Sequence, residues 1–128
     1  VETSAWVEFF RHPHSRWADV VDLVLGEDRA CTTGLVMVEV ISGARTKTEF
    51  ERLRTDFEAL PQVSPLPTLW EDMLETRWRL KIQGVPGMSI PDLIVAHVAL
   101  AHGKIILTCD HDFWRMRSVL GLKLLAIS

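Results

Sequence analysis

The chain has 128 residues, 48% of them hydrophobic, which favours one globular domain over residues 1–128 and excludes a disordered chain. Its longest uncharged apolar stretch, Leu93–Ala101, is too short to cross a bilayer, which takes about 20 residues. No signal-like segment precedes the first predicted element, so we expect a cytoplasmic protein without a membrane partner. The net charge of −3 does not exclude nucleic acid binding, because five of the acids are predicted below to share one pocket.

Helices and short apolar segments alternate along the chain. Val1-Glu2 is interpreted as the end of a strand, with Thr3 or Ser4 capping a helix that runs to about Arg11. Apolar periodicity and capping residues predict further helices at 16–26, 47–60, 68–84, 89–103 and 111–121. Short strands are predicted at 29–33, 61–66, 104–109 and 122–128. This alternation predicts a parallel sheet covered on both faces, and ligands of such sheets bind beyond the carboxyl ends of the strands.

Two carboxylates come directly after a strand that we expect to be buried. The stretch "KIILTCDHDFW" places Asp110 and Asp112 one residue apart at its end. Capping of the helix that follows is a sufficient reason for either aspartate alone. Cys109, like Cys31, lies in apolar context and is expected to be a reduced core residue rather than half of a disulfide.

Three other acids stand in comparable positions. Asp92 follows Ser89 in a capping-box pattern, so a structural role is again sufficient for it. Glu39 is the only charged residue in an apolar run and is expected to be buried. A buried carboxylate needs an ion pair, for example with Arg45, or a metal ion. Glu2 ends the first predicted strand, although in isolation it reads as a solvated acid.

The acids share one geometry, because each lies at a strand end or on a helix leading away from one. A cluster of carboxylates without lysine suits Mg²⁺ or Mn²⁺, whereas zinc prefers histidine and cysteine. His97 and His102 are expected to be packing or capping groups, and His111 is a lesser candidate for the pocket mouth.

With these residues assembled, the sequence resembles PIN-domain proteins, most closely VapC-type toxins of toxin–antitoxin pairs. The resemblance rests on four ordered motifs: "VETSAWVEFFR", "VMVEVISGA", "SIPDLIVAHVALAHG" and "ILTCDHDF". It implies a three-layer α/β/α fold with a central parallel sheet of four to five strands. Residues 33–43 favour a strand by β-branched content, and only the resemblance makes them a helix, with Thr33 as its cap and Gly43 at its end.

The resemblance implies a metal-dependent endoribonuclease. Glu2, Asp92 and Asp110 would hold one Mg²⁺ or Mn²⁺, with Glu39 and Asp112 completing the site. The ion would activate a water and stabilise the charge that develops at an RNA phosphodiester, leaving a 5′-phosphate and a 3′-hydroxyl.

Two residues next to the acids are candidates to orient them, and one of the acids departs from the family pattern. Ser4 and Thr108 are the candidate orienting residues, and capping and strand roles explain them equally well. The family's first acid is normally Asp, so Glu2 extends the carboxylate by about 1.5 Å. A natural variant that binds metal, a deliberate change and a natural loss of activity all fit this difference. The alternative function is therefore a catalytically impaired PIN-domain binding module.

Partners follow from the resemblance and from the surface pattern. RNA would contact basic residues near the pocket, with Arg11, Arg115, Arg117 and Lys104 as candidates. The resemblance also implies a homodimer and a VapB-type antitoxin that blocks the acidic pocket. The apolar stripes of two helices are candidate contacts for these partners: Phe50, Phe57, Leu69, Trp70, Met73 and Trp78. A haloacid-dehalogenase-type phosphatase, suggested by Asp-x-Asp after a strand, is disfavoured because the pair follows the penultimate strand.

Overall fold

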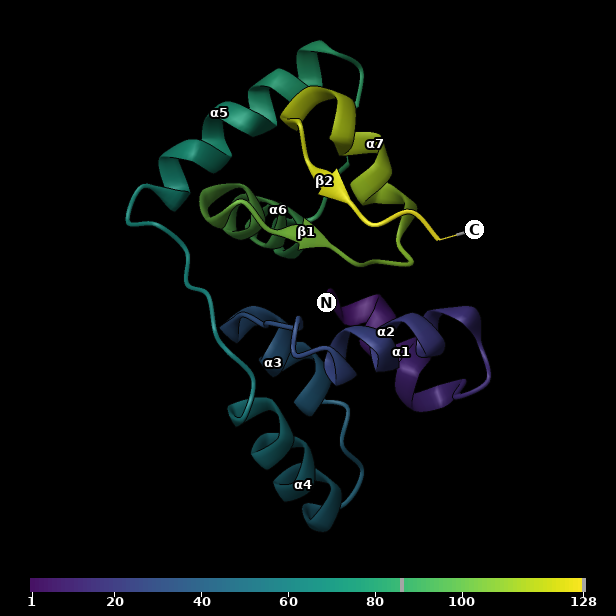
Figure 1. Ribbon diagram of the computed structural model, residues 1–128. Helices are drawn as coiled ribbons and strands as arrows, with labels where there is room; N and C mark the ends of the chain where they lie inside the picture. Colours follow the sequence, from purple (N-terminus) through teal and green to yellow (C-terminus); the bar gives the residue numbers. More distant parts are fainter. Residues whose placement is uncertain (86, 128) are drawn as a thin grey trace. The chain divides into compact units, whose positions relative to one another are not determined.

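The computed structural model describes residues 1–85 and 87–127 (Figure 1). Their contacts divide them into two compact units, Val1–Val63 and Ser64–Ala126, with Ile127 grouped with the first. The first unit contains four helices: α1 (Thr3–Arg11), α2 (Arg16–Gly26), α3 (Gly34–Ile41) and α4 (Lys47–Glu58). The second contains three helices and two short strands: α5 (Leu69–Ile82), α6 (Ile90–His102), β1 (Ile105–Ile106), α7 (His111–Leu120) and β2 (Lys123–Leu124).

Six of the seven helices in the described residues are those that capping and apolar periodicity predict, whereas α3 is the helix that only the family resemblance predicts. Serine and threonine side chains cap several of them, with Ser15 accepting from the Ala18 amide and Ser89 from the Asp92 amide. α6 ends at Gly103, whose φ of 61° lies in the left-handed region that glycine adopts without strain. Capping and apolar periodicity therefore fix the helix positions.

The start of α1 differs from the prediction. Its N-cap is Glu2, neither Thr3 nor Ser4, because the Glu2 carboxylate accepts a hydrogen bond from the Ser4 amide at 3.0 Å. Val1-Glu2 is extended but is not assigned as a strand; the Val1 amine donates to the Cys31 carbonyl oxygen at 3.3 Å.

Regular strands are much shorter than expected within the described ranges. β1 and β2 pair in parallel, Ile105 with Lys123 and Ile106 with Leu124. In the first unit the pairing reduces to a single parallel bridge between Thr32 and Gln62. The parallel α/β character is therefore present, whereas a sheet of four to five strands is not. Ser128, the end of the last predicted strand, lies outside the described residues.

Each unit has its own apolar core. In the first, Trp6 of α1 packs edge-on against Phe57 of α4, with ring centroids 4.9 Å apart. In the second, α6 is almost continuously apolar and contacts α5, α7 and β1 (Figure 1), as its sequence predicts. Cys31 and Cys109 are both partly buried and are not joined in a disulfide, as expected. None of the helices in the described ranges combines the length and the hydropathy that crossing a bilayer demands.

Candidate functional site

Three aspartates of the second unit bring carboxylate oxygens together. One oxygen from each of Asp92, Asp110 and Asp112 lies within 4.8 Å of the others, and all three side chains are partly buried. Asp92 lies in the first turn of α6, Asp110 is the N-cap of α7, and Asp112 lies in the first turn of α7. Two helix N-termini, whose partial positive charge favours nearby carboxylates, therefore position the cluster.

Short-range hydrogen bonds fix the geometry of this cluster. The Asp110 carboxylate accepts from the Asp112 amide at 2.9 Å, and the Asp110 amide donates to Thr108 Oγ1 at 3.0 Å. Thr108 itself is buried, with 2% of its surface exposed. Asp110 therefore caps α7, as its position in the sequence allows, and it also belongs to the cluster of three acids.

Electrostatic repulsion makes this arrangement suited to a cation. Two carboxylates 4.8 Å apart repel by about 1 to 3.5 kcal/mol at effective dielectric constants between 80 and 20. The neighbouring arginine offsets little of this, because the pair of Arg115 with Asp112, at 3.2 Å, is largely exposed. Three oxygen donors of this kind fit a hard divalent ion.

The two predicted glutamates belong to the first unit and lie on either side of Thr3. Glu2, 7% exposed, accepts hydrogen bonds from both the amide and the hydroxyl of Ser4. Thr3 Oγ1 donates to Glu39 Oε1 at 2.8 Å, joining α1 to α3. This role of Thr3 has no signal in the sequence, because the two residues are 36 positions apart and the position of Thr3 indicates only a helix cap.

The predicted burial of Glu39 is wrong. The segment is a helix, so its buried positions follow helical spacing, and α3 buries Val36 and Val40 while Glu39 and Val38 face outward. The salt bridges among the described residues do not include a Glu39–Arg45 pair. Glu39 is therefore an exposed carboxylate oriented by a hydroxyl.

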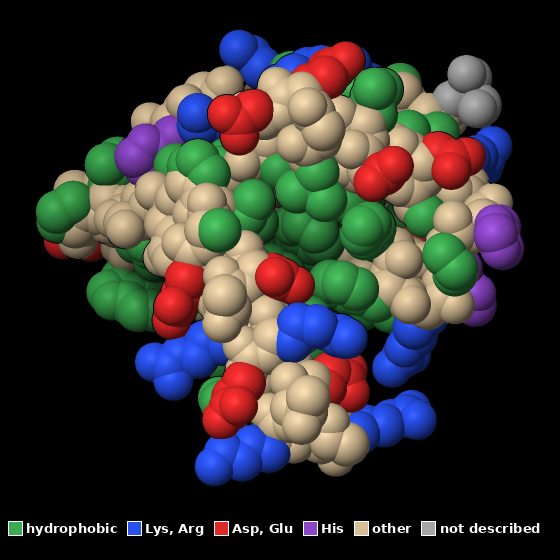
Figure 2. All heavy atoms as spheres, turned by 60° about the horizontal axis from the view of Figure 1, so that its bottom comes forward, with side chains coloured by type: hydrophobic (Ala, Val, Ile, Leu, Met, Phe, Trp, Pro, Cys, Tyr) green, Lys and Arg blue, Asp and Glu red, His purple; other side chains and the backbone are tan. Residues whose placement is uncertain are grey.

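The basic candidates take different positions. Arg115 is tied to Asp112, whereas the guanidinium of Arg117 lies over the Trp114 ring, 5.5 Å from its centroid. Arg11 and Lys104 are exposed. α4 carries charges of both signs. In the lower part of the view in Figure 2, basic and acidic side chains are interleaved. This mixture does not favour α4 as a surface for a polyanion.

Two histidines of the second unit, His97 and His102, form hydrogen bonds within that unit. His97 Nε2 lies 2.9 Å from Thr76 Oγ1, and burial lowers the pKa of His97, which Asp72 partly opposes. His102 Nε2 lies 2.7 Å from the Ser64 carbonyl oxygen. His111 is exposed at the start of α7. The packing role predicted for His97 is confirmed, whereas His102 does not cap a helix but joins the last turn of α6 to the segment before α5.

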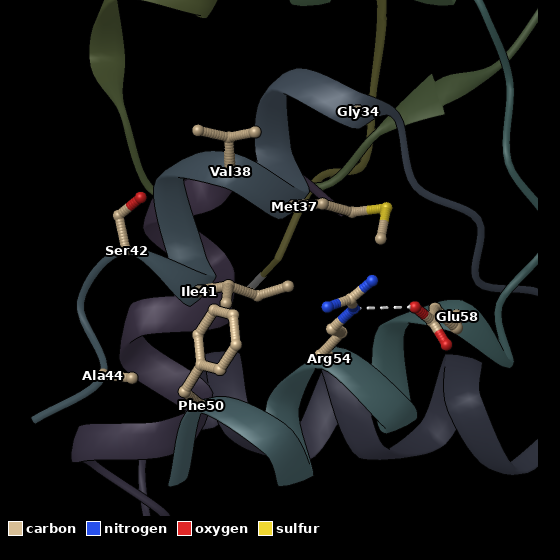
Figure 3. A pocket seen from close by; sticks show the side chains of 9 residues that line it. All are labelled: Gly34, Met37, Val38, Ile41, Ser42, Ala44, Phe50, Arg54 and Glu58. Atoms are coloured by element: carbon tan, nitrogen blue, oxygen red, sulfur yellow. Dashed lines mark hydrogen bonds and ion pairs between the residues drawn. The ribbon is translucent and has the colours of Figure 1, made fainter. Parts of the chain in front are cut away.

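An apolar groove of about 560 Å³ lies between α3 and α4 in the first unit (Figure 3). Figure 3 shows Ile41 of α3 beside Phe50 of α4 and Met37 near Arg54, which forms an ion pair of 3.0 Å with Glu58. Val38 also lines the groove but points away from Phe50. None of the predicted metal-binding acids lines it, although Glu39 follows Val38 directly on α3. The groove is therefore a surface of a different kind from the acidic site.

The aromatic and aliphatic stripes divide between core and surface. Phe57, Leu69 and Met73 are buried, so packing explains them. Trp70 and Trp78 remain more than half exposed, and Phe50 lines the groove. Of the six contacts predicted from the sequence, these three remain candidates.

Comparisons with known proteins agree with the sequence motifs. The model of the PIN domain family matches residues 1–119. The chain is 34% identical over 125 residues to "VapC ribonuclease Mb1587" of Mycobacterium bovis and to "Ribonuclease VapC11" of Mycobacterium tuberculosis, which covers 88% of this chain and 87% of each relative.

Two solved structures have a similar fold. One is VapBC2 from Rickettsia felis bound to a promoter DNA fragment, with 17% identity, a TM-score of 0.74, and 99% of this chain and 96% of that chain covered. The other is VapBC-1 from nontypeable Haemophilus influenzae, with 19% identity, a TM-score of 0.75, and coverage of 97% and 93%.

Proposed function

The chain belongs to the PIN domain family, and we propose that it is the toxin of a type II toxin–antitoxin pair, a metal-dependent endoribonuclease that cleaves RNA phosphodiesters. The observation that carries the proposal is the convergence of Asp92, Asp110 and Asp112 in a chain whose curated relatives are named as ribonucleases. The fit of this cluster to a hard cation supplies the chemistry that the family assignment implies.

Asp92 and Asp110 are assigned as ligands that bind the ion directly or through water, and Asp112 as an accessory ligand. Glu2 and Glu39, both of the first unit, are assigned as further catalytic acids, and residues 1–128 as a single PIN domain. The hydrogen bond from Thr3 to Glu39 supports a shared role for the two glutamates, because it holds the Glu39 carboxylate beside the residue that follows Glu2.

The ion that fits is Mg²⁺ or Mn²⁺, because all the proposed donors are carboxylate oxygens. When bound, such an ion supplies Lewis-acid stabilisation of a phosphodiester and makes water a better nucleophile at neutral pH. The chain's own part is to hold the oxygens in place. Ser4 orients Glu2, Thr3 orients Glu39, and Thr108 fixes the backbone of Asp110.

RNA contacts are assigned to exposed cations, with Arg117 ahead of the others. Arg117 is held against the Trp114 ring on α7, the helix that starts at Asp110. A guanidinium and a partly exposed indole together can bind a phosphate and stack on a base. Arg115 contributes less, because Asp112 already engages it, and Arg11 is retained as a peripheral contact. Cellular RNA as the substrate places the protein in the cytoplasm.

The antitoxin partner is assigned to the α3–α4 groove. An antitoxin of the VapB type that laid apolar side chains between Met37 and Phe50 would lie within one helical turn of Glu39. A basic side chain of the same peptide could then pair with the Glu39 carboxylate. Replacing Val38, 64% exposed, with aspartate is expected to weaken antitoxin binding without unfolding the chain.

Cleavage of structured RNA tests the function. Bulk transfer RNA is incubated with the chain and Mg²⁺ or Mn²⁺, with and without a chelator, beside the variants Asp92→Asn and Asp110→Asn. We expect metal-dependent cuts that leave a 5′-phosphate and a 3′-hydroxyl, and a loss of at least about 100-fold in either variant. The matched control is Asp56→Asn on α4, an exposed aspartate outside the proposed site, which should cut like the parent. Cutting that survives both site substitutions would refute the assignment.

The binding-module alternative is not supported by the comparisons, since relatives that span most of the chain are named as ribonucleases. The substitution Glu2→Asp addresses it directly. Aspartate keeps the helix cap and shortens the side chain by one methylene, so the variant should cut RNA at least as fast as the parent. An inactive parent beside an active Glu2→Asp variant would instead identify Glu2 as a disabling residue.

A further inference from the structure

The turn between α1 and α2 presents basic and aromatic side chains close together. Residues 10–17, which we call the 10–17 segment, read Phe-Arg-His-Pro-His-Ser-Arg-Trp. The sequence has no acid between Glu8 and Asp19, although the first unit as a whole has more acids than bases. Apart from Pro13, the exposed residues of the segment are Phe10, Arg11, His12, His14 and Arg16. The segment is therefore a local basic surface on an otherwise acidic unit.

The two arginines of the segment are available to an external anion. The ion pairs found within residues 1–85 and 87–127 include neither Arg11 nor Arg16. The one acid paired with the segment is Glu8, whose carboxylate lies 3.9 Å from His12 Nε2, and such a long, exposed pair contributes little. Guanidinium groups without an internal partner are well suited to phosphate oxygens, which they can bind with two parallel hydrogen bonds.

Phe10 supplies an aromatic surface that is fixed in place. Its side chain is 46% exposed, and its ring is nearly parallel to that of Trp6, with an interplanar angle of 18° and ring centroids 6.0 Å apart. Phe9 meets the Phe10 ring edge-on at 5.3 Å. Trp6 is buried and packs against Phe57, so Phe10 rests on the core of the first unit. A base that stacked on Phe10 would extend this aromatic cluster, and ordering the ring would cost little entropy.

Hydrogen bonds hold the turn itself. The Ser15 amide donates to the His12 carbonyl oxygen at 2.9 Å, which closes a four-residue turn with Pro13 at its second position, where proline presets the backbone angle. Ser15 Oγ accepts from the Ala18 amide at 3.1 Å and caps α2. His12 and His14 are therefore carried on a fixed backbone, and imidazole is one of the rings on which RNA bases stack.

We propose that the 10–17 segment is a second RNA-binding surface, which takes a single-stranded stretch of the substrate. Its aromatic rings stack with bases, and Arg11 and Arg16 bind phosphates. Cations together with aromatic rings are how proteins bind single strands, because every base offers a π face. A duplex keeps the faces of its bases stacked on one another, so a stacking surface favours an unpaired strand. The choice of RNA as the ligand rests on the proposed ribonuclease function.

The segment lies at the far end of α1 from the carboxylates of the first unit. α1 has 9 residues, so Arg11 is about 12 Å along the helix axis from Thr3. Thr3 and its neighbour Ser4 are the residues that orient Glu39 and Glu2. Because these glutamates are assigned to catalysis, the segment would contact nucleotides away from the one that is cut. Substitutions in it should weaken substrate binding more than they slow the cleavage step.

The first test is the salt dependence of RNA binding by the whole chain, measured in chelator so that metal-dependent cleavage does not interfere. Fluorescence anisotropy of a labelled single-stranded RNA of about 12 nucleotides gives Kd at several salt concentrations. Each phosphate contact contributes about 0.7 to the slope of log K against log salt, so the double variant Arg11→Gln, Arg16→Gln should lower the slope by about 1.4. The matched control is Arg45→Gln, Arg52→Gln, which removes the same charge from exposed positions of the same unit and should keep the parent's slope. A parent that does not bind the strand, or equal slopes in the two double variants, would overturn the proposal.

The second test separates stacking from charge. Phe10→Leu leaves the charge unchanged and should weaken binding of the single strand about tenfold, the typical contribution of one stacked base. The matched control is Phe50→Leu on α4, where the phenylalanine is 41% exposed, and it should bind like the parent. Circular dichroism checks that both variants fold. Unlabelled duplex RNA of the same length should compete at least about tenfold more weakly than the unlabelled single strand. Equal competition by the duplex would identify a plain polyanion surface and overturn the proposal.

Because these binding measurements need no catalysis, they separate this inference from the proposed function. A chain that binds the strand through the segment but cuts no RNA would refute the ribonuclease function alone. A chain that cuts RNA while both double variants bind it equally would refute the second surface alone. Where both are correct, the loss in Arg11→Gln, Arg16→Gln should appear in KM more than in kcat.

Discussion

Replacing Asp110 with asparagine should have opposite effects on stability without and with a divalent ion. Asparagine caps a helix as well as aspartate does, so the hydrogen bond from the Asp112 amide is retained. The substitution removes one of three charges whose oxygens lie within 4.8 Å of one another. Each pair contributes about 1 to 3.5 kcal/mol of repulsion, and the lost attraction to the N-terminus of α7 offsets about 0.3–1 kcal/mol, so the substitution should stabilise the metal-free protein by about 1 kcal/mol.

Thermal unfolding with and without Mn²⁺ measures this effect. For a chain of this size, 1 kcal/mol corresponds to about 4 °C, so Asp110→Asn should melt about 4 °C or more above the parent in chelator. At a Mn²⁺ concentration of 100 times Kd, the parent gains about 2.7 kcal/mol, or about 10 °C, whereas the variant gains little. The order of the two melting temperatures should therefore reverse.

The control for this experiment is Asp56→Asn, which removes one exposed carboxylate of α4 and should melt like the parent in both buffers. A variant less stable than the parent in chelator would mean that the three acids are not under electrostatic strain. If neither Mn²⁺ nor Mg²⁺ changes the melting temperature of the parent, the metal site itself is refuted.

Three further substitutions test single contacts. Burial lowers the pKa of His97, so the unfolded chain binds more protons than the folded chain below about pH 6.5, and the stability of the protein should fall with acidification. Chemical denaturation at pH 7.5 and 5.5 should show a smaller fall in stability for His97→Gln than for the parent. An equal fall in both proteins would contradict the assignment. Thr3→Val removes the hydrogen bond to Glu39 and should lower the free energy of unfolding in denaturant by about 0.5–1 kcal/mol. It should also slow RNA cleavage. An unchanged cleavage rate would show that catalysis does not require Thr3 to orient Glu39. Gly103→Ala places a side chain at φ 61° in open space, so calorimetry should show a loss of about 1–2 kcal/mol from backbone strain alone.

Every helix except α3 could be predicted from the sequence because its signals are local, whereas the β-branched residues of α3 favour a strand. A capping serine, an apolar period of three to four residues and a terminal glycine all lie within one element, as in α6 between Ser89 and Gly103. Strand lengths depend on pairing partners far along the chain. Thr32 pairs with Gln62, and Ile106 pairs with Leu124, so the extent of each ladder could not be read from the strand itself.

The candidate site shows the same division. Asp110 and Asp112 were identified because they follow an apolar strand directly, and Asp92 because it sits in a helix cap. The burial of Glu39 was mispredicted because an apolar run was assumed to be covered on all sides, whereas α3 exposes Val38 beside it. The Thr3–Glu39 hydrogen bond had no sequence signal, since it depends on how α1 and α3 pack.

The proposed function requires that the cluster of Asp92, Asp110 and Asp112 holds a divalent ion. A crystal of the chain soaked in Mn²⁺, with anomalous scattering recorded to locate the ion, tests this requirement directly. The account predicts one strong peak about 2–2.5 Å from oxygens of Asp92 and Asp110. No peak at these aspartates, or an ion bound only elsewhere on the chain, would contradict it.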